Sequence, residues 1–311
     1  MKRTSLIVDW KLAFGLLLGM AVSFSTYAQQ ATTQNHHYFQ DDDGEYGWDS
    51  ENRTGWVFGL NIGAYFANKK SANFYNGDGT GSINDVQARK LTIEERLIES
   101  GTPTFQQVTN AIGAESFFIP FDSSPQAMRY NPGIMVGLRV GYRLNNENGF
   151  FMDVNVASIK AADKFTLTTN LLPDPLQGTS DTRLYNIIGE ESRLNIALGY
   201  RAAVVINETS NWYFEGGGSM LATRLDANYL EIEGQTYNLW VDTSFGPNNI
   251  NGPTANLTST GYGFYFGTGL EMFYNDKYEF DIGLRFARDK VIMGSFEQNM
   301  LNTQFFISVT I

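Results

Sequence analysis

Histidine and clustered carboxylates are the first side chains in this chain that could do chemistry. The two histidines, His36 and His37, are followed by the acidic run Asp41-Asp42-Asp43-Gly44-Glu45. Adjacent histidines rarely converge on one ion, and the acidic run lacks the full ligand spacing of a calcium loop. We therefore expect a solvated tail here, with no metal and no cofactor.

Nucleophilic catalysis has few candidate groups in this sequence. There is no cysteine, and no histidine follows His37 that could activate a serine. The remaining candidates are the carboxylates Glu94, Glu95 and Glu99 in the first long connection. We predict that the chain is not an enzyme, and a lipid-modifying or proteolytic activity is the least favoured hypothesis.

A larger set of charged side chains recurs at every second position of several apolar stretches. Arginine supplies all of its cations, and the planar guanidinium is preferred over lysine in buried ion pairs. We predict that this set forms a network of charges inside a closed sheet. Its members are Arg139, Arg143, Asp153, Arg193, Arg201, Glu215, Glu271, Glu279, Asp281, Arg285 and Asp289.

The elements that carry these charges are predicted to be β-strands. In the first, Trp56, Phe58, Leu60 and Ile62 share one face and Asn61 lies on the other, which is the period of two of a strand. Eight such stretches occur between Gly55 and Ile311. They predict an all-β, closed, antiparallel, up-and-down barrel.

Short and long connections alternate between these strands. Three tight turns are predicted, near Asn145–Gly149, Asn207–Asn211 and Asn275–Lys277. The long loops are expected at Ala67–Tyr130, Thr168–Glu191, Leu225–Ser259 and Lys290–Asn302. Short turns at one end and long loops at the other are typical of outer-membrane barrels, with the long loops extracellular.

The first of the long loops is the most distinctive. Val86, Leu91, Ile93, Leu97 and Ile98 are spaced for one apolar face of a helix, which predicts a short helix over Ile83–Ser100. The loop can also hold an additional hairpin near Phe117–Phe121, which would give ten strands instead of eight. We consider it either a lid over the barrel mouth or a docking surface.

The composition agrees with an exported barrel. Charged residues make up 18% of the chain, and glycine (31), phenylalanine (23) and tyrosine (16) are abundant, which favours long strands. The net charge of −11 argues against nucleic acid as a partner. Residues 1–28 have the pattern of a signal peptide, with Lys2 and Arg3 before an apolar run and Ala28 before the cleavage point. We divide the rest into a polar tail, 29–54, and the barrel, 55–311.

A soluble barrel would bury the apolar face, whereas a membrane barrel exposes it to lipid. Aromatic residues decide between the two, because they gather on the apolar face at the short-turn end, where a membrane interface would lie. This predicted girdle comprises Trp56, Tyr142, Phe150, Trp212, Tyr274 and Tyr278.

With a signal peptide and eight amphipathic strands, the chain resembles the small outer-membrane barrels typified by the OmpA transmembrane domain and OmpW. The last strand, Asn302–Ile311, resembles their C-terminal assembly signal, and Tyr27-Ala28-Gln29-Gln30 resembles the signal ending of exported proteins of Bacteroidota. The resemblance implies an outer-membrane location, contact with outer-membrane lipid, and recognition by the assembly machinery. Because the strand number is even and the short turns are expected in the periplasm, we expect both termini to be periplasmic.

Two functional hypotheses remain open beside the enzyme. The chain is a non-enzymatic barrel with a structural or partner-binding role in the cell envelope. Alternatively, it is a narrow pore for small solutes, as the resemblance to OmpW implies. Charges paired across a narrow interior oppose the pore.

Overall fold

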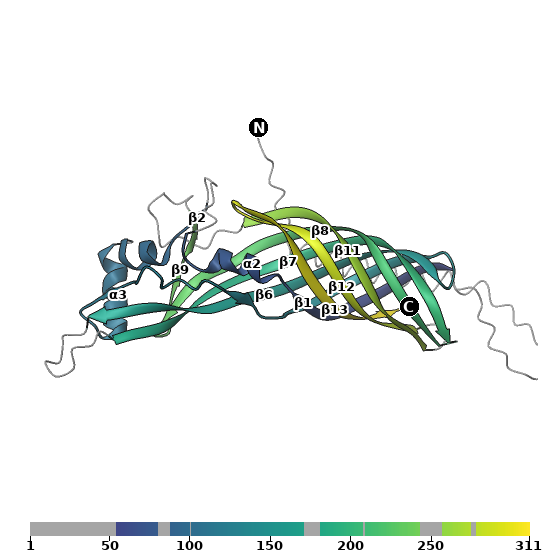
Figure 1. The fold of residues 1–311 in the computed structure, drawn as a ribbon, viewed down its shortest axis with the longest axis horizontal. Coiled ribbons are helices and arrows are strands. Elements are labelled where there is room, and N and C mark those ends of the chain that lie inside the picture. The colour runs from purple at the N-terminus through teal and green to yellow at the C-terminus, as the bar shows by residue number, and fades with distance from the viewer. Residues whose placement is uncertain are drawn as a thin grey trace, which may run out of the picture.

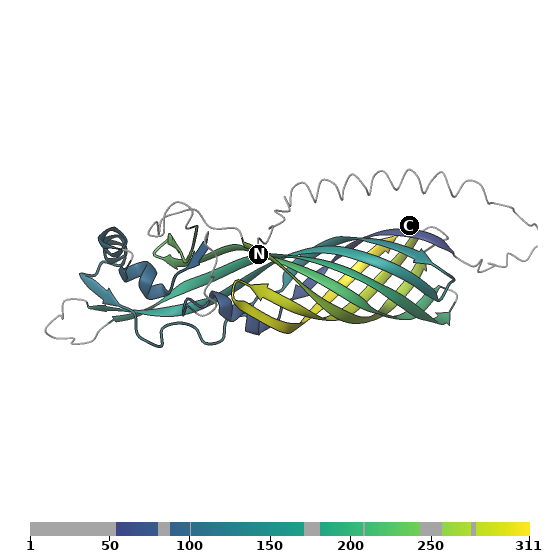
Figure 2. The ribbon, with the colours of Figure 1, turned by 90° about the horizontal axis from the view of Figure 1, so that it is seen from above.

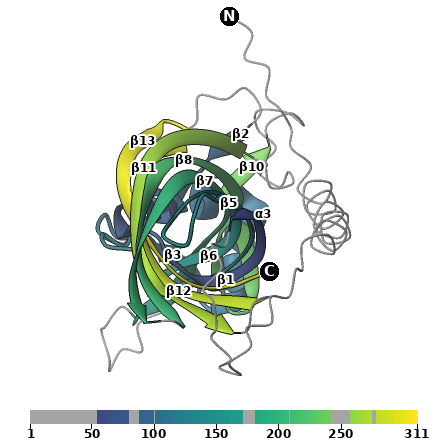
Figure 3. The same cartoon turned by 90° about the vertical axis from the view of Figure 1, so that its right-hand side faces the viewer.

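A closed ring of eight strands forms the body of the molecule in the computed structural model, which describes residues 54–79, 88–99, 101–170, 181–207, 209–242, 257–274 and 278–311. Neighbouring strands pair antiparallel in chain order, and pairing of β11 with β8 closes the ring (Figure 3). The strands are β1 (Gly55–Phe66), β5 (Gly133–Arg143), β6 (Asn148–Asn170), β7 (Asp181–Asn207), β8 (Ser210–Ile232), β11 (Leu257–Tyr274), β12 (Tyr278–Met293) and β13 (Phe296–Thr310). The predicted up-and-down barrel of eight strands is confirmed.

The barrel has its apolar face outside. On β1, Trp56 is 67% exposed and Leu60 62% exposed, whereas Asn61 between them is 3% exposed. The same alternation holds along β5, where Arg139 is buried between half-exposed apolar neighbours. No helix in the described ranges is long and apolar enough to cross a bilayer. An apolar outer wall around a charged interior identifies a barrel that spans a membrane with its strands.

The outward apolar residues form a band with two clear limits. At the short-turn end the band begins with the aromatic side chains of Trp56, Phe150 and Trp212, all exposed. At the other end the first outward charges are the cations Lys160 on β6, Arg224 on β8 and Arg288 on β12, with the carboxylate of Glu190 on β7 beside Lys160. Residues beyond these cations lie outside the band.

Three strands continue far past this limit. The long strands β6, β7 and β8 leave the ring together and form a curved sheet that extends from the long-loop end (Figures 1 and 2). We call the sheet past the apolar band, with the segments packed on it, the extension. Three of the predicted long loops are therefore wrong in part. Strands β6 and β7 occupy much of Thr168–Glu191, β8 and β11 occupy the two ends of Leu225–Ser259, and the β12–β13 hairpin occupies Lys290–Asn302. The change from apolar to polar outward residues marks the edge of the apolar band rather than the end of a strand.

Short elements from the first long connection and from the segment after β8 complete the extension. They are α2 (Lys69–Ala72), the 3-10 helix η1 (Asn73–Tyr75), β2 (Ala88–Lys90), the π-helix η2 (Glu95–Glu99), α3 (Thr102–Ile112), β3 (Ser116–Phe118), β4 (Arg129–Tyr130), β9 (Gln235–Asn238) and β10 (Trp240–Asp242). Their apolar side chains share one core with the inner face of the sheet, in which Phe74, Leu97 and Trp240 are at most 2% exposed. Burial of this kind stabilises a folded unit of its own.

The predicted helix over Ile83–Ser100 is wrong in its bounds. Positions 83–87 lie outside the described residues, and Ala88–Lys90 is a strand that pairs with β10. Helical structure begins after Thr92, because the Thr92 hydroxyl accepts a hydrogen bond from the amide of Glu95 while the Glu95 carboxylate accepts one from the amide of Thr92. This capping box is visible in the sequence and fixes the helix start.

The main helix of the extension, α3, was not predicted. Gly101, at a φ of 104°, separates η2 from α3. Pro103 lies in the first turn of α3, where a proline costs no hydrogen bond. At its other end, the Arg183 guanidinium on β7 donates to the Ile112 carbonyl at 2.9 Å. A cation at a helix C-terminus is favourable, so this contact fixes α3 against the sheet.

The alternative of ten barrel strands is not found among the described residues. β3, within the region considered for an extra hairpin, pairs with β6 opposite Thr168–Asn170, in the extension and outside the ring. It lengthens the sheet of the extension and does not widen the barrel.

One lysine lies in the core of the extension. Lys90 is 6% exposed, its ammonium donates to the Phe74 carbonyl, and it lies 4.5 Å from the centre of the Phe74 ring. Burial lowers the pKa of Lys90 to about 8, and the charge of Asp78 opposes this only in part. Folding therefore requires either desolvation of the charge or loss of the proton.

We expect the stability of the extension to rise with pH above pH 8. Between pH 8 and pH 10.5 the unfolded state binds the Lys90 proton and the folded state does not, so unfolding becomes less favourable as pH increases, by up to about 3 kcal/mol. Urea unfolding followed by the fluorescence of buried Trp240, with Trp48, Trp56 and Trp212 replaced by phenylalanine, measures this. Lys90→Met should flatten the pH dependence, and an unchanged slope in that variant would show that another group is responsible.

Candidate functional site in the barrel lumen

A network of ion pairs fills the lumen between the short-turn end and the middle of the barrel. Period-two alternation aims these side chains inward from β5, β6, β7, β8, β11 and β12, and all except half-buried Arg143 are buried. We call them the lumen network: Arg139, Arg143, Asp153, Arg201, Glu215, Glu271, Glu279, Asp281 and Arg285.

Arg139 and Asp153 form the best-aligned pair of the network. The guanidinium donates in two-pronged fashion, with Nε to Oδ1 at 2.7 Å and Nη2 to Oδ2 at 2.9 Å. Its Nη1 reaches across the lumen to Asp281 at 2.7 Å. Because β5 and β12 are not neighbours in the ring, this pair spans the interior.

Two further arginines connect the remaining strands. Arg285 on β12 donates through Nε to Glu215 on β8 at 2.9 Å and also contacts Asp153. Arg201 on β7 lies 2.9 Å from Asp281 and 3.2 Å from Glu271. Every guanidinium of the lumen network thus contacts more than one carboxylate.

Aromatic rings occupy the space between the ions. The Arg201 guanidinium lies 3.7 Å from the centre of the Tyr213 ring, and Arg285 lies 4.4 Å from that of Tyr265. Glycine makes room for these rings, since a Cβ at Gly269 would fall 2.5 Å from the Tyr213 hydroxyl. Rings stacked on guanidinium groups exclude water and strengthen the ion pairs around them.

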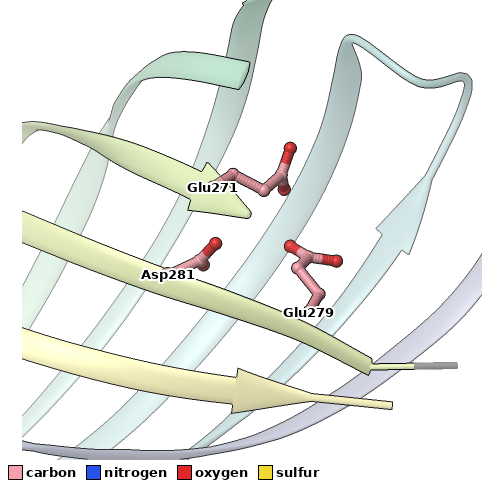
Figure 4. Close-up of side chains that lie close together, drawn as sticks. All are labelled: Glu271, Glu279 and Asp281. Atoms are coloured by element: carbon pink, nitrogen blue, oxygen red, sulfur yellow. The ribbon is translucent and has the colours of Figure 1, made fainter. Parts of the chain in front are cut away.

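Near the short-turn end, three carboxylates converge: Glu271 on β11, with Glu279 and Asp281 on β12 (Figure 4). Their oxygen atoms lie within 4.8 Å of one another, which is compatible with a metal ion. Arg143 and Arg201 already contact this group, with Arg143 at 2.7 Å from Glu271. The cations that balance these carboxylates are therefore arginines of the chain itself.

The structure separates two predicted members from the rest of the charge network. Arg193 and Asp289 lie closer to the long-loop end. Asp289 accepts from Ser219 at 2.5 Å and from the Asn302 amide at 3.3 Å. Arg193 pairs with Glu191, a residue that the sequence analysis assigned to a loop.

Glu191 is the centre of a second polar cluster, which fastens the first long connection to the barrel mouth. Its Oε2 accepts from the hydroxyl groups of Tyr75 at 2.6 Å and Tyr130 at 3.0 Å, while Oε1 accepts from Arg193. Arg193 also donates to Ser71 at 3.2 Å. Continuing the alternation of Arg193 by one step places Glu191 on the same inward face, so the sequence contains the signal that was missed.

The candidate catalytic groups do not form a site among the described residues. His36, His37 and the acidic run 41–45 lie outside the described ranges. Glu94 and Glu99 are exposed on the extension, and Glu95 is held in the capping box. No hydrogen bond between described residues brings a nucleophile against Glu94 or Glu99.

The six predicted girdle residues all lie on the outer wall and are exposed by 42–67%. Trp56 packs edge-on against Tyr142, with ring centres 5.4 Å apart, and Tyr274 is paired with Tyr278 across the β11–β12 ladder. Tyr200 on β7 joins them and stacks edge-on against Phe150 at 5.3 Å. Tyr200 was not among the predicted girdle residues, although it has the same outward parity.

Comparisons with known proteins find similarity of structure alone. No protein-family model and no curated protein sequence matches the chain. Among solved structures, Neisserial surface protein A has 10% identity and a TM-score of 0.35, with 83% of this chain and 96% of that chain covered. The outer membrane protein OprG from Pseudomonas aeruginosa has 7% identity and a TM-score of 0.35, covering 83% and 97%. The outer membrane protein AlkL has 10% identity and a TM-score of 0.31, covering 89% and 95%. At these scores the barrel assignment rests on the strand pairing of this chain itself.

We expect Arg201→Met to destabilise the barrel by about 3–5 kcal/mol, because it removes one of the two arginines that neutralise each of the buried carboxylates Asp281 and Glu271. The temperature at which the folded band is lost in a heat-dependent gel shift measures the effect. Lys160→Met is the matched control, since Lys160 pairs with Glu190 at 3.2 Å on the exposed surface and should cost less than about 1 kcal/mol. Equal stability of the two variants would contradict a structural role for the lumen network.

Proposed function

We propose that this chain is a non-enzymatic outer-membrane protein whose closed barrel anchors the extension, and that the extension is a docking platform for a partner in the cell envelope. The observation that carries the proposal is the continuation of β6, β7 and β8 past the apolar band into a unit with its own core. A loop that served only to connect two strands would not need that core.

The closed lumen supports an anchor in preference to a transporter. Ion pairs cross the interior from several strands, and the Glu191 cluster holds α2 and η1 over the mouth. Opening a path would require separating desolvated charges, which costs several kcal/mol for each pair.

The sequence supports the finer details of this placement. A signal peptide at 1–28 and an assembly signal in Asn302–Ile311 favour export and insertion into the outer membrane of a Gram-negative bacterium of the Bacteroidota type. Because the number of strands is even, the first and last residues of the barrel lie on the same side of the membrane. The short turns favour the periplasm for that side. The polar segment 29–54 would then be a periplasmic tail, and the extension would face the cell exterior.

A narrow pore remains the second candidate, favoured by one observation. The buried side-chain amides of Asn195 and Gln304 have no hydrogen-bond partner among the residues that the structure describes. Asn195 lies between Arg193 and Arg201 along β7, so it faces the lumen between the two charged groups. Buried amides of this kind are usually satisfied by water.

Single-channel recording separates these two functions. We expect the refolded mature chain, Gln29–Ile311, to give no conductance steps in a planar bilayer, because the lumen network closes the interior. A gel shift on heating confirms that the silent protein is folded, and a wide porin in the same bilayer is the positive control. Reproducible steps would instead establish the pore.

Surface labelling of a chain without cysteine tests the location and the orientation. Phe121→Cys replaces a fully exposed residue of the extension, and Glu147→Cys replaces an exposed residue in the first short turn. On intact cells a membrane-impermeant maleimide should label the Phe121→Cys protein and not the Glu147→Cys protein. The latter should react once the outer membrane is permeabilised. The reverse pattern would place the extension in the periplasm and overturn the proposal.

A further inference from the structure

Arg288 differs from the other cations at the edge of the apolar band. Lys160 and Arg224 are paired with Glu190 and Asp226, at 3.2 and 2.6 Å. Arg288 points outward from β12, is exposed, and forms no ion pair with any residue that the structure describes. A cation on the outer wall is therefore left without a counter-charge among the residues that the structure describes.

The residues beside Arg288 are apolar and face the lipid. In the strand register it lies opposite Phe264 on β11 and Leu301 on β13, which are 62% and 56% exposed. Phe286, the next outward residue toward the short-turn end, is 39% exposed. The guanidinium thus projects from an apolar surface and not from a polar one.

The height of Arg288 on the wall matches the level of lipid headgroups. A tilted barrel strand advances about 2.5 Å along the barrel axis per residue, so Arg288 lies about 25 Å from the girdle residue Tyr278 on the same strand. That is the height of the apolar band of outer-membrane barrels. At this level a long side chain can extend its charge to the headgroups while its carbon stem stays in hydrocarbon.

A second cation lies next to Arg288. Lys290 is the following outward residue of β12 and pairs with Glu297 at 2.5 Å. Two cations and one carboxylate leave this part of the wall positive, in a chain whose net charge is −11. The positive charge is complementary to an anion held at headgroup level.

We propose that Arg288 binds the phosphate of a phosphorylated lipid in the outer leaflet, with the acyl chains against Phe264, Phe286 and Leu301. The planar guanidinium fits a phosphate with two parallel hydrogen bonds, and Lys290 adds charge beside it. This inference rests on the outer-membrane location proposed above. A carboxylate from a protein partner or from a second copy of the chain is the rival occupant.

Lipid retention in nanodiscs tests the site. The folded chain is inserted into phosphatidylcholine nanodiscs that contain either lipid A or dephosphorylated lipid A, and the lipid retained on the protein after release is counted by native mass spectrometry. We expect the wild type to retain at least five times more lipid A than its dephosphorylated form. Arg288→Gln should abolish this preference, while Lys160→Gln, which alters a paired cation at the same level, should preserve it.

Two results would overturn the proposal. One is an inserted wild-type protein with no preference for the phosphorylated lipid, or an Arg288→Gln protein that keeps the full preference. The other is a dimer in the mass spectrum that Arg288→Gln dissociates while lipid retention stays the same, which would assign Arg288 to a second copy. Failure of the proposed function is distinct, because it appears as failed insertion or as reversed cysteine labelling.

Discussion

Pairing between guanidinium and carboxylate groups across a narrow interior is the constraint on which this structure depends. A lipid-facing wall must be apolar, so the alternate residues of every strand point into a lumen where charges are desolvated. Pairing offsets the cost of desolvation, because Arg139, Arg201 and Arg285 each contact several carboxylates. The same ion pairs therefore connect opposite strands of the ring and fill the lumen between them. The aromatic rings and the inward glycines follow from the same lack of room.

Strand parity explains how much of this could be predicted from the sequence. A period of two assigns every residue of a strand to one of two faces, and the residues of the lumen network and the girdle were found in this way. Parity cannot tell which inward charges meet, because that depends on the stagger of strands far apart in the chain. Arg193 and Asp289 share the parity of the lumen network but lie closer to the long-loop end of the barrel. There Arg193 pairs with Glu191, and Asp289 accepts a hydrogen bond from Ser219.

The extension was the least predictable part, for a physical reason. Outward residues become polar wherever a sheet leaves hydrocarbon, and the same change marks the end of a strand in an ordinary barrel. Glu191 was assigned to a loop, although it lies within β7. In the first long connection the apolar residues Leu91, Ile93 and Leu97 do enter a core. Their spacing predicts a buried face, but only local signals such as the Thr92–Glu95 capping box and Gly101 set the helix bounds.

The unbroken course of β6, β7 and β8 has a mechanical consequence. Each strand runs from the short turns, through the bilayer, to the far end of the extension without an intervening hinge loop. Hydrogen bonds in an antiparallel ladder lie perpendicular to the strands. A pull on the extension along the strands therefore puts the backbones of β6, β7 and β8 in tension. It loads in shear the ladders that join these strands to the rest of the ring, β5–β6 and β8–β11, instead of opening their bonds one after another. The barrel and the extension are therefore joined by continuous strands, which transmit a force applied on one side of the membrane to the other side.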